Sequence, residues 1–400
     1  MFFKYLEKYS GCAFMCFIYF FCLYPLYAYL ERSDRLPHIP LTLFFYTIPV
    51  LVLAFVFFSS LLHCRYVDRK GFRLLFLILF IFIYILMVVF FNSSFWSFEV
   101  TQDNLAAIVY MVFAFIVGFY LSRLDRYSKY ILGFYWGVSM FWLLHVDYSV
   151  FLIDFSRFKT PEAEAIYLKI GEGYAILAIL GIYVSRSKKY LPAIISLLSI
   201  PILFFINSRA SLFIYIMVLM FPFFTLSNWY RYSLIFSFVV VCFLILSYVN
   251  IDLILDSRVL RLIFNTEEDT SLQLRNDFMD RELLHLWKNW FWGDYSNYIL
   301  REGEGGSIHN YLAFWAQYGF MPFLCMCMLF VCFMVFNIRQ WLKYHSQYIF
   351  NIMLFSFALI AAWTAKSYSY QLIWVVLGMS LREYLEFRHK SKISYYLCQR

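Results

Sequence analysis

The sequence predicts an all-α protein that crosses a membrane many times, and three observations support this fold class. Of its 400 residues, 63% are hydrophobic and 14% are charged, whereas about a quarter of the residues of soluble domains are charged. The apolar residues form runs of about 17–22, the length that a helix needs to cross roughly 30 Å of hydrocarbon. One polar stretch, residues 251–319, separates the earlier runs from the later ones. We therefore expect about twelve transmembrane helices and one large loop.

The expected helices divide the chain into three parts. Residues 1–250 hold the first nine helices, residues 251–319 form the loop with short interfacial helices, and residues 320–400 hold the last three helices and a basic tail. The helices are expected at 12–30, 41–62, 74–91, 105–122, 131–153, 171–184, 191–206, 210–226, 233–250, 320–336, 348–363 and 371–387. No cleavage pattern follows the first run, so we expect it to be an anchor.

The basic residues predict the orientation of these helices. If the amino terminus is cytoplasmic, most lysines and arginines fall in cytoplasmic segments. The short outer loops then hold only Arg32, Arg35, Arg157, Lys159, Lys169, Arg209 and Lys366. Since basic residues are retained on the cytoplasmic side, both termini are expected there. The net charge of +8 then reflects topology, and no nucleic-acid partner is expected.

The polar segment is expected to fold into short helices at the outer face. Residues 251–264 alternate apolar and charged positions, which favours a helix lying on the membrane surface. Thr270 precedes Gln273 by three residues, a capping-box pattern that predicts a helix running to about Trp290 and ending at Gly293.

A glycine-rich turn, GEGGS, follows and delivers His309 and Asn310 to the start of an aromatic helix. The start of a helix exposes backbone N–H groups and the positive end of its dipole, which favours anions. A histidine has a pKa near neutrality and can accept a proton from a reacting hydroxyl. His309 is therefore the candidate catalytic base, with Asn310 as a supporting residue.

Arginines supply the candidate anion site. Arg209 lies in the five-residue turn NSRAS, close to the hydrocarbon boundary, where an arginine is costly unless it is paired or faces water. Arg275 and Arg281 lie on the loop helix. A guanidinium pairs phosphate oxygens in a bidentate manner. Each arginine also has a structural interpretation, as a snorkelling side chain or as a partner of Asp277 or Asp280.

Two other groups of polar residues are weaker candidates for a functional site. The acidic run 267–269 could hold a metal, but a solvated turn is the simpler interpretation, and we expect neither a metal nor a cofactor. No D-x-D motif for a metal-bound nucleotide sugar occurs in the loop. His145 and Asp147 form a second histidine–carboxylate pair, but residues two apart face different sides of a helix.

Three of these motifs, in this order, resemble the O-antigen polymerase and O-antigen ligase superfamily of bacterial envelope glycosyltransferases. They are the serine–arginine in NSRAS, an arginine leading a loop helix that ends at a glycine (Arg275 to Gly293), and GEGGSIHNYLAFWAQYG. The resemblance covers the seventh to the tenth expected helix. The chain departs from the family pattern at WKNWFWGDY, which lacks the usual proline, so Arg281 remains an alternative to Arg275.

The resemblance implies a membrane glycosyltransferase (GT-C-like) fold in a bacterial inner membrane, with the active site facing the periplasm. It implies that Arg209 and Arg275 bind undecaprenyl diphosphate and that His309 activates the acceptor in an inverting, metal-independent reaction. The implied substrate is an undecaprenyl-diphosphate-linked oligosaccharide, and the implied protein partner is a chain-length regulator.

Three functions remain open from the sequence. A polymerase would join repeat units, and a ligase would transfer the glycan to the lipid A core; the three site residues do not separate them. We expect a polymerase, because the aromatic-rich chain with its compact loop resembles the polymerases more. A flippase for lipid-linked oligosaccharides is the third possibility, but such folds usually show two related halves and charged residues near the middle of a span, and the sequence shows neither an evident half repeat nor charged mid-span residues.

Overall fold

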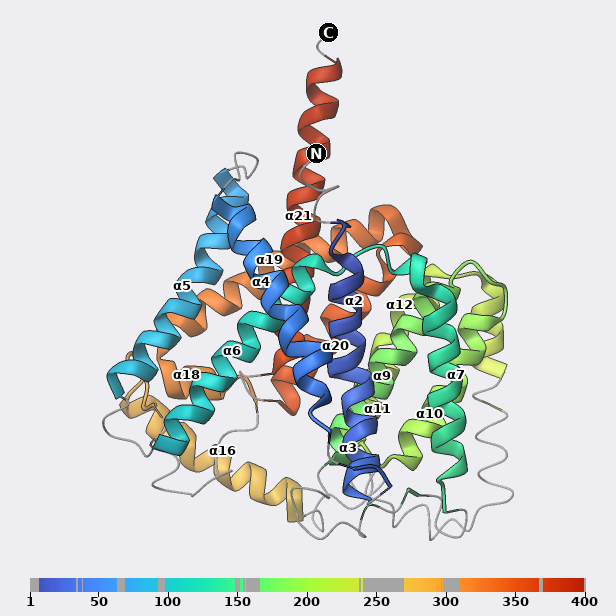
Figure 1. Ribbon diagram of the computed structural model, residues 1–400, viewed down its shortest axis with the longest axis horizontal. Coiled ribbons are helices and arrows are strands. Elements are labelled where there is room, and N and C mark those ends of the chain that lie inside the picture. The colour runs from blue at the N-terminus through green and yellow to red at the C-terminus, as the bar shows by residue number, and fades with distance from the viewer. Residues whose placement is uncertain are drawn as a thin grey trace.

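The computed structural model describes residues 7–33, 35–37, 39–62, 69–92, 98–147, 152–153, 155, 166–236, 239, 270–295, 297, 310–366 and 370–398. This part of the chain is helical and contains no strand; an isolated antiparallel bridge joins Asp147 and Leu152. The helices form one bundle, and both chain termini lie at the same end of it (Figure 1). The all-α prediction is confirmed for these residues.

The amino-terminal half of the bundle begins with two helices that each contain a π-helical turn. The first consists of α2 (Ser10–Ile18), η1 (Tyr19–Leu23) and α3 (Tyr24–Arg32), and the second of η2 (Leu43–Thr47) and α4 (Ile48–Leu62). The next elements are α5 (Arg69–Asn92), α6 (Phe98–Tyr120), η4 (Leu124–Tyr127), α7 (Ser128–Leu144), α9 (Ile166–Ser185), α10 (Leu191–Phe205), α11 (Arg209–Val218) and α12 (Met220–Thr225).

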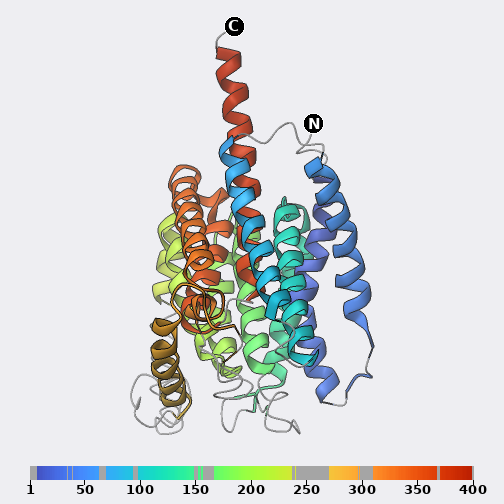
Figure 2. The ribbon, with the colours of Figure 1, turned by 90° about the vertical axis from the view of Figure 1, so that its left-hand side faces the viewer.

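The carboxy-terminal half contains one polar helix, α16, and four helices that are more apolar or longer. The elements are α16 (Thr270–Lys288), α18 (Leu312–Tyr318), α19 (Phe320–Tyr344), η6 (His345–Gln347), α20 (Ile349–Thr364) and α21 (Gln371–Cys398). Turned by 90°, the bundle shows α16 at the end opposite the termini (Figure 2). The polar loop helix therefore lies where the sequence predicted the outer face.

Helices overlap eleven of the twelve predicted runs, but the fifth run, 131–153, was predicted too long, because α7 ends at Leu144 and Asp147 and Leu152 form a bridge instead. The ninth run, 233–250, lies largely outside the described residues. By length and composition, five described helices could cross a membrane: Ser10–Arg32, Gly71–Asn92, Val100–Tyr120, Ile166–Ser185 and Phe320–Gln347. These helices support a helical membrane protein, while the number of twelve spans and their orientation stay predictions.

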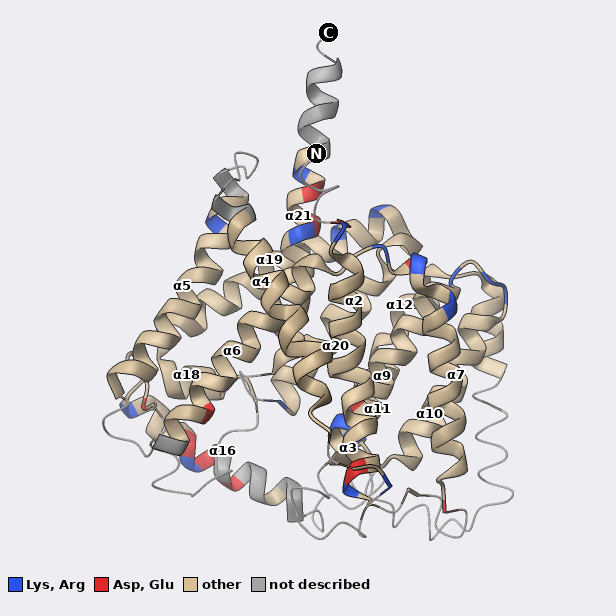
Figure 3. Ribbon diagram, viewed as in Figure 1, with Lys and Arg blue, Asp and Glu red and all other residues tan. Residues whose placement is uncertain are grey.

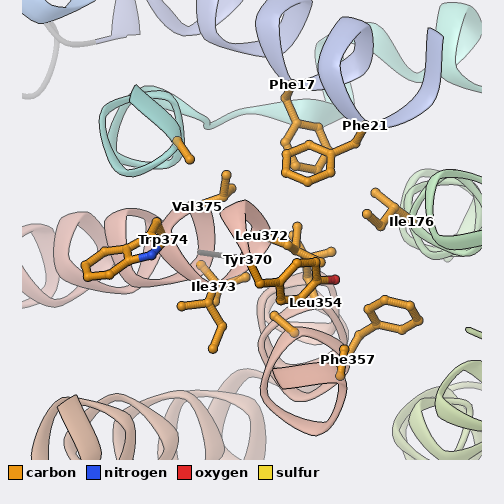
Figure 4. Close-up of a cluster of buried hydrophobic side chains, with 14 of the residues drawn as sticks. Phe17, Phe21, Ile176, Leu354, Phe357, Tyr370, Leu372, Ile373, Trp374 and Val375 are labelled. Atoms are coloured by element: carbon orange, nitrogen blue, oxygen red, sulfur yellow. The ribbon is translucent and has the colours of Figure 1, made fainter. Parts of the chain in front are cut away.

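The core lies where α21 packs along α6 and α20, and where α9 packs against α7 and α10. Its side chains come from helices far apart in the sequence: Figure 4 shows Phe17 and Phe21 on one side of Leu372 and Tyr370, with Ile176 and Leu354 nearby. Gly378 of α21 lies against the backbone of α6, where a Cβ would meet the carbonyl oxygen of Phe115. Small residues allow this close approach between membrane helices.

The charges divide between the two ends of the bundle. Lysines and arginines gather at the end that holds the termini, with fewer at the other end (Figure 3). At the terminal end, Arg123 pairs with Glu7 and Arg186 with Asp125, each at 2.5 Å. This distribution agrees with the charge asymmetry on which the predicted orientation depends.

Candidate functional site

Two glycines lock the polar loop to the bundle. Gly293 and Gly319 both have positive φ angles, +78° and +85°. A Cβ on Gly293 would lie 2.5 Å from the amide nitrogen of Gly319, so only glycine fits. Around this contact the Asp294 amide donates to the carbonyl of Ala316 at 2.7 Å, and the Phe320 amide donates to that of Phe291 at 3.1 Å. The end of the polar segment is thus fixed to the start of α19.

The loop helix ends earlier than the sequence predicted. α16 stops at Lys288 instead of Trp290, and a turn leads from there to Gly293. A residue of α18 stabilises this turn, because the indole N–H of Trp315 donates to the Trp290 carbonyl at 2.7 Å. The glycine that resembles the family pattern is therefore a packing residue of the turn.

α16 packs on α18 through one face. Glu282 and Leu286 on this face are buried, although most other described side chains of α16 are exposed. The Asn310 amide lies 3.8 Å from the Met279 sulfur, and its oxygen accepts a hydrogen bond from the Leu312 amide at 2.9 Å. Asn310 therefore bonds to the first residue of α18 and touches α16.

The other candidates on this loop are placed to different extents. His309 lies outside the described residues, as do the glycines of GEGGS and the acidic run 267–269. Arg275 belongs to α16, which fixes its backbone position only. Arg281 is exposed, and its Nε donates to the Asp277 carbonyl one turn earlier at 3.2 Å. These positions do not distinguish Arg275 from Arg281 as the anion-binding residue.

Arg209 is the first residue of α11 and is half-buried. The turn before it is tight: Asn207 has a φ of +60°, and the buried Ser208 hydroxyl donates to that of Ser211 at 2.9 Å. Ser208 rests on Gly171 of α9, where a Cβ would overlap the serine side chain. The short turn predicted from NSRAS is confirmed, and it places Arg209 beside α9.

The structure places the candidates in two neighbourhoods. α11 packs against α9, α10 and α20, whereas α16 packs against α18. α18 in turn contacts α19, and α19 contacts α20. α11, which begins with Arg209, and the loop helix α16 are thus connected through three intervening helices, α20, α19 and α18, and both helices are seen in Figure 1.

Three charged residues form a further cluster, which the sequence analysis missed. Lys169 and Glu172 lie on α9, which begins at Ile166 and not at residue 171, and the Lys366 ammonium is 2.7 Å from the Glu172 carboxylate. Glu172 is 8% exposed, and Arg382 within α21 is 2% exposed. Both positions lie within predicted spans, 171–184 and 371–387, so buried charges occur in these two helices. The available signal was GEG, a glutamate between two glycines in an apolar run.

In the remaining candidate pair, His145 and Asp147, the histidine ring contacts other residues. The Nε2 atom of His145 contacts the guanidinium of Arg35, and its Nδ1 lies 2.8 Å from the Phe141 carbonyl oxygen. These contacts fasten the end of α7 to the segment after α3. Among the described residues, no group of three or more His, Cys, Asp or Glu side chains is arranged to hold a metal ion.

The fold and the charged end of the bundle define the class as an all-helical, membrane-embedded protein. In comparisons with known proteins, no protein-family model, no curated protein and no solved structure matches the chain.

Proposed function

We propose that the protein is a membrane glycosyltransferase that uses a polyprenyl-diphosphate-linked glycan as donor, and specifically an O-antigen polymerase of a bacterial inner membrane. The observation that carries the proposal is the placement of Arg209. A half-buried arginine begins α11 at the same end of the bundle as α16 and Asn310. An arginine at such a depth is costly unless it is paired, meets an anion or faces a water-filled space, and a guanidinium at the start of this helix suits diphosphate binding.

The proposed chemistry is a displacement at the anomeric carbon of the lipid-linked sugar. Arg209 and Arg275 bind the diphosphate, which leaves with the bonding electron pair of the anomeric C–O bond. His309 takes the proton from the attacking acceptor hydroxyl, and the new glycosidic bond forms on the opposite face of the sugar. Asn310 supports this site, because its contacts with Met279 and Leu312 fix the start of α18 directly after His309.

The test is lipopolysaccharide banding in a strain that lacks this gene and carries a restored variant. His309→Ala should remove the ladder, because loss of a general base slows such a step by about 10²–10⁴-fold. Arg209→Ala should do the same through lost diphosphate binding. Arg126→Ala is the matched control, since Arg126 is exposed at the opposite end, and it should restore the ladder fully.

The banding pattern also separates the alternatives. A core carrying a single repeat unit in the deletion strain identifies a polymerase. A bare core with full-length glycan on the lipid carrier identifies a ligase. If His309→Ala and Arg209→Ala both restore the normal ladder, the proposed enzyme is excluded, and a flippase, which needs no proton acceptor, becomes the better explanation.

A further inference from the structure

A cavity of about 370 Å³ lies beside the Glu172–Lys366 ion pair. Its volume is in the range of small-molecule sites. It is lined by Phe20, Phe21, Tyr24, Pro25, Thr42, Tyr110, Lys169, Glu172, Lys366, Tyr370 and Gln371. Both π-helical turns border it, since Phe20 and Phe21 belong to η1 and Thr42 precedes η2. Such turns are frequent at functional sites.

The charges in this cavity do not cancel. Lys366 is engaged by the Glu172 carboxylate at 2.7 Å and lies 5.5 Å from the centre of the Tyr370 ring. Lys169 lies one turn from Glu172 on the same face of α9. Among the described residues, the Lys169 ammonium forms no salt bridge and no hydrogen bond, and it lines the cavity. One positive charge therefore remains for a ligand, and an anion with a single negative charge would balance it.

The cavity is also amphipathic. Its charged groups lie near the ends of helices: Lys169 is the fourth residue of α9, and Lys366 follows α20. Its aromatic part is deeper, because Tyr110 lies in the middle of α6, where Phe20 packs against it with ring centroids 6.2 Å apart. Tyr110 is 37% exposed on this apolar helix, so the aromatic part opens toward the surrounding hydrocarbon.

We propose that this cavity binds the phosphate headgroup of an anionic lipid. Lys169 meets the phosphate, and the start of the hydrocarbon chain lies along Phe20 and Tyr110. Glu172 holds Lys366 and repels the phosphate, so it weakens binding by competition for the same cation. A free anion would use the charges alone, whereas the lateral aromatic opening fits a ligand that arrives from the bilayer. The proposal concerns binding and does not depend on the transfer reaction.

The experiment is native mass spectrometry of the purified full-length protein with three lipids: phosphatidylglycerol, a polyprenyl phosphate and zwitterionic phosphatidylcholine. Phosphatidylglycerol or the polyprenyl phosphate should bind more tightly than phosphatidylcholine, and the tighter of the two identifies the source of the phosphate. Lys169→Ala should weaken that binding about tenfold or more, because a charge-assisted contact is lost. Lys169→Arg should retain it.

Two further variants make the result decisive. Glu172→Gln should tighten anionic-lipid binding, a change of sign that a purely structural ion pair would not produce. Lys188→Ala is the matched control, since Lys188 is exposed beyond the other end of α9, and it should bind as the unchanged protein does. If Lys169→Ala fails to fold, Lys169→Gln replaces it. Equal binding of all three lipids, or unchanged binding in the Lys169 variant, would overturn the proposal.

Discussion

The ion pairs at the two ends of the bundle differ in exposure. At the end with the termini, each pair joins a half-exposed side chain to a partly buried one, Arg123 at 48% to Glu7 at 18% and Asp125 at 53% to Arg186 at 20%. At the other end, the side chains of Glu172 and Lys366 are 10% and 26% exposed. Exposed pairs contribute little to stability, whereas a buried pair has to overcome a large desolvation penalty. The pair of Glu172 with Lys366 therefore carries a larger desolvation cost than the two pairs at the terminal end.

The two ends also differ in how closely the backbone packs around their glycines. The opposite end is closed by the contact of Gly293 with Gly319, whereas Gly133 in α7 has open space around its Cα. Substitutions that challenge these features should have effects that decrease from the glycine contact to the buried pair to the exposed pair.

The largest effect is expected for Gly293→Ala. A side chain there has a φ of +78° and meets the backbone of Gly319, so strain and overpacking should destabilise the loop region by about 2–6 kcal/mol. The measurement is the apparent Tm of the purified protein in detergent. Gly133→Ala is the control and should leave the Tm unchanged or raise it slightly, as alanine favours helix. Equal Tm values for the two variants would contradict the packing described.

A smaller effect is expected for Lys366→Ala, which leaves Glu172 buried without its partner. Breaking a buried pair costs roughly 3–5 kcal/mol, and the partial exposure of Lys366 reduces this to about 2–4 kcal/mol. The double variant Glu172→Leu with Lys366→Met should recover most of the lost Tm, because no unpaired charge remains. Failure of the double variant to recover stability would show that the pair is held for its packing.

The smallest effect is expected for Asp125→Asn at the terminal end. The hydrogen bond from Arg186 lowers the pKa of the Asp125 carboxyl, ahead of the opposing effect of partial burial. The pair therefore stabilises the fold above the ordinary aspartate pKa of about 3.9, and this contribution is lost as the pH falls through the lowered value. At neutral pH the variant should lose only about 0–1 kcal/mol.

The pH dependence provides the check for this last variant. Unfolding followed from pH 7 to pH 3 should show that the difference between Asp125→Asn and the unchanged protein disappears at the acid end. Asp103→Asn, at an exposed position of α6, should show no difference at any pH. A difference that grows as the pH falls would have the wrong sign for this ion pair.

The sequence predicted the elements whose signal is local. Apolar runs located eleven helices, and NSRAS located the tight turn before Arg209. The sequence could not predict that Lys169 and Lys366, almost two hundred residues apart, line one cavity, because helix packing decides this. It also could not predict that Gly293 meets Gly319, since each glycine by itself indicates only a turn. The arrangement around His309 stays a prediction from the resemblance.

The glycine contact has a further consequence for how the protein can vary. The Asp294 amide is bonded to the Ala316 carbonyl beside it, so the two ends of the intervening segment are held close together, while Tyr295, Tyr311 and Phe314 within it are buried in the core. The entropy of closing such a segment rises slowly with length, about 0.6 kcal/mol for each doubling. Insertions between residues 298 and 309 should therefore leave the packing of α18 on α16 and α19 intact, whereas exchange of the buried Tyr311 or Phe314 should disturb it. Changes in length next to the proposed acceptor base are thus expected to be tolerated, and changes in its buried aromatic side chains are not.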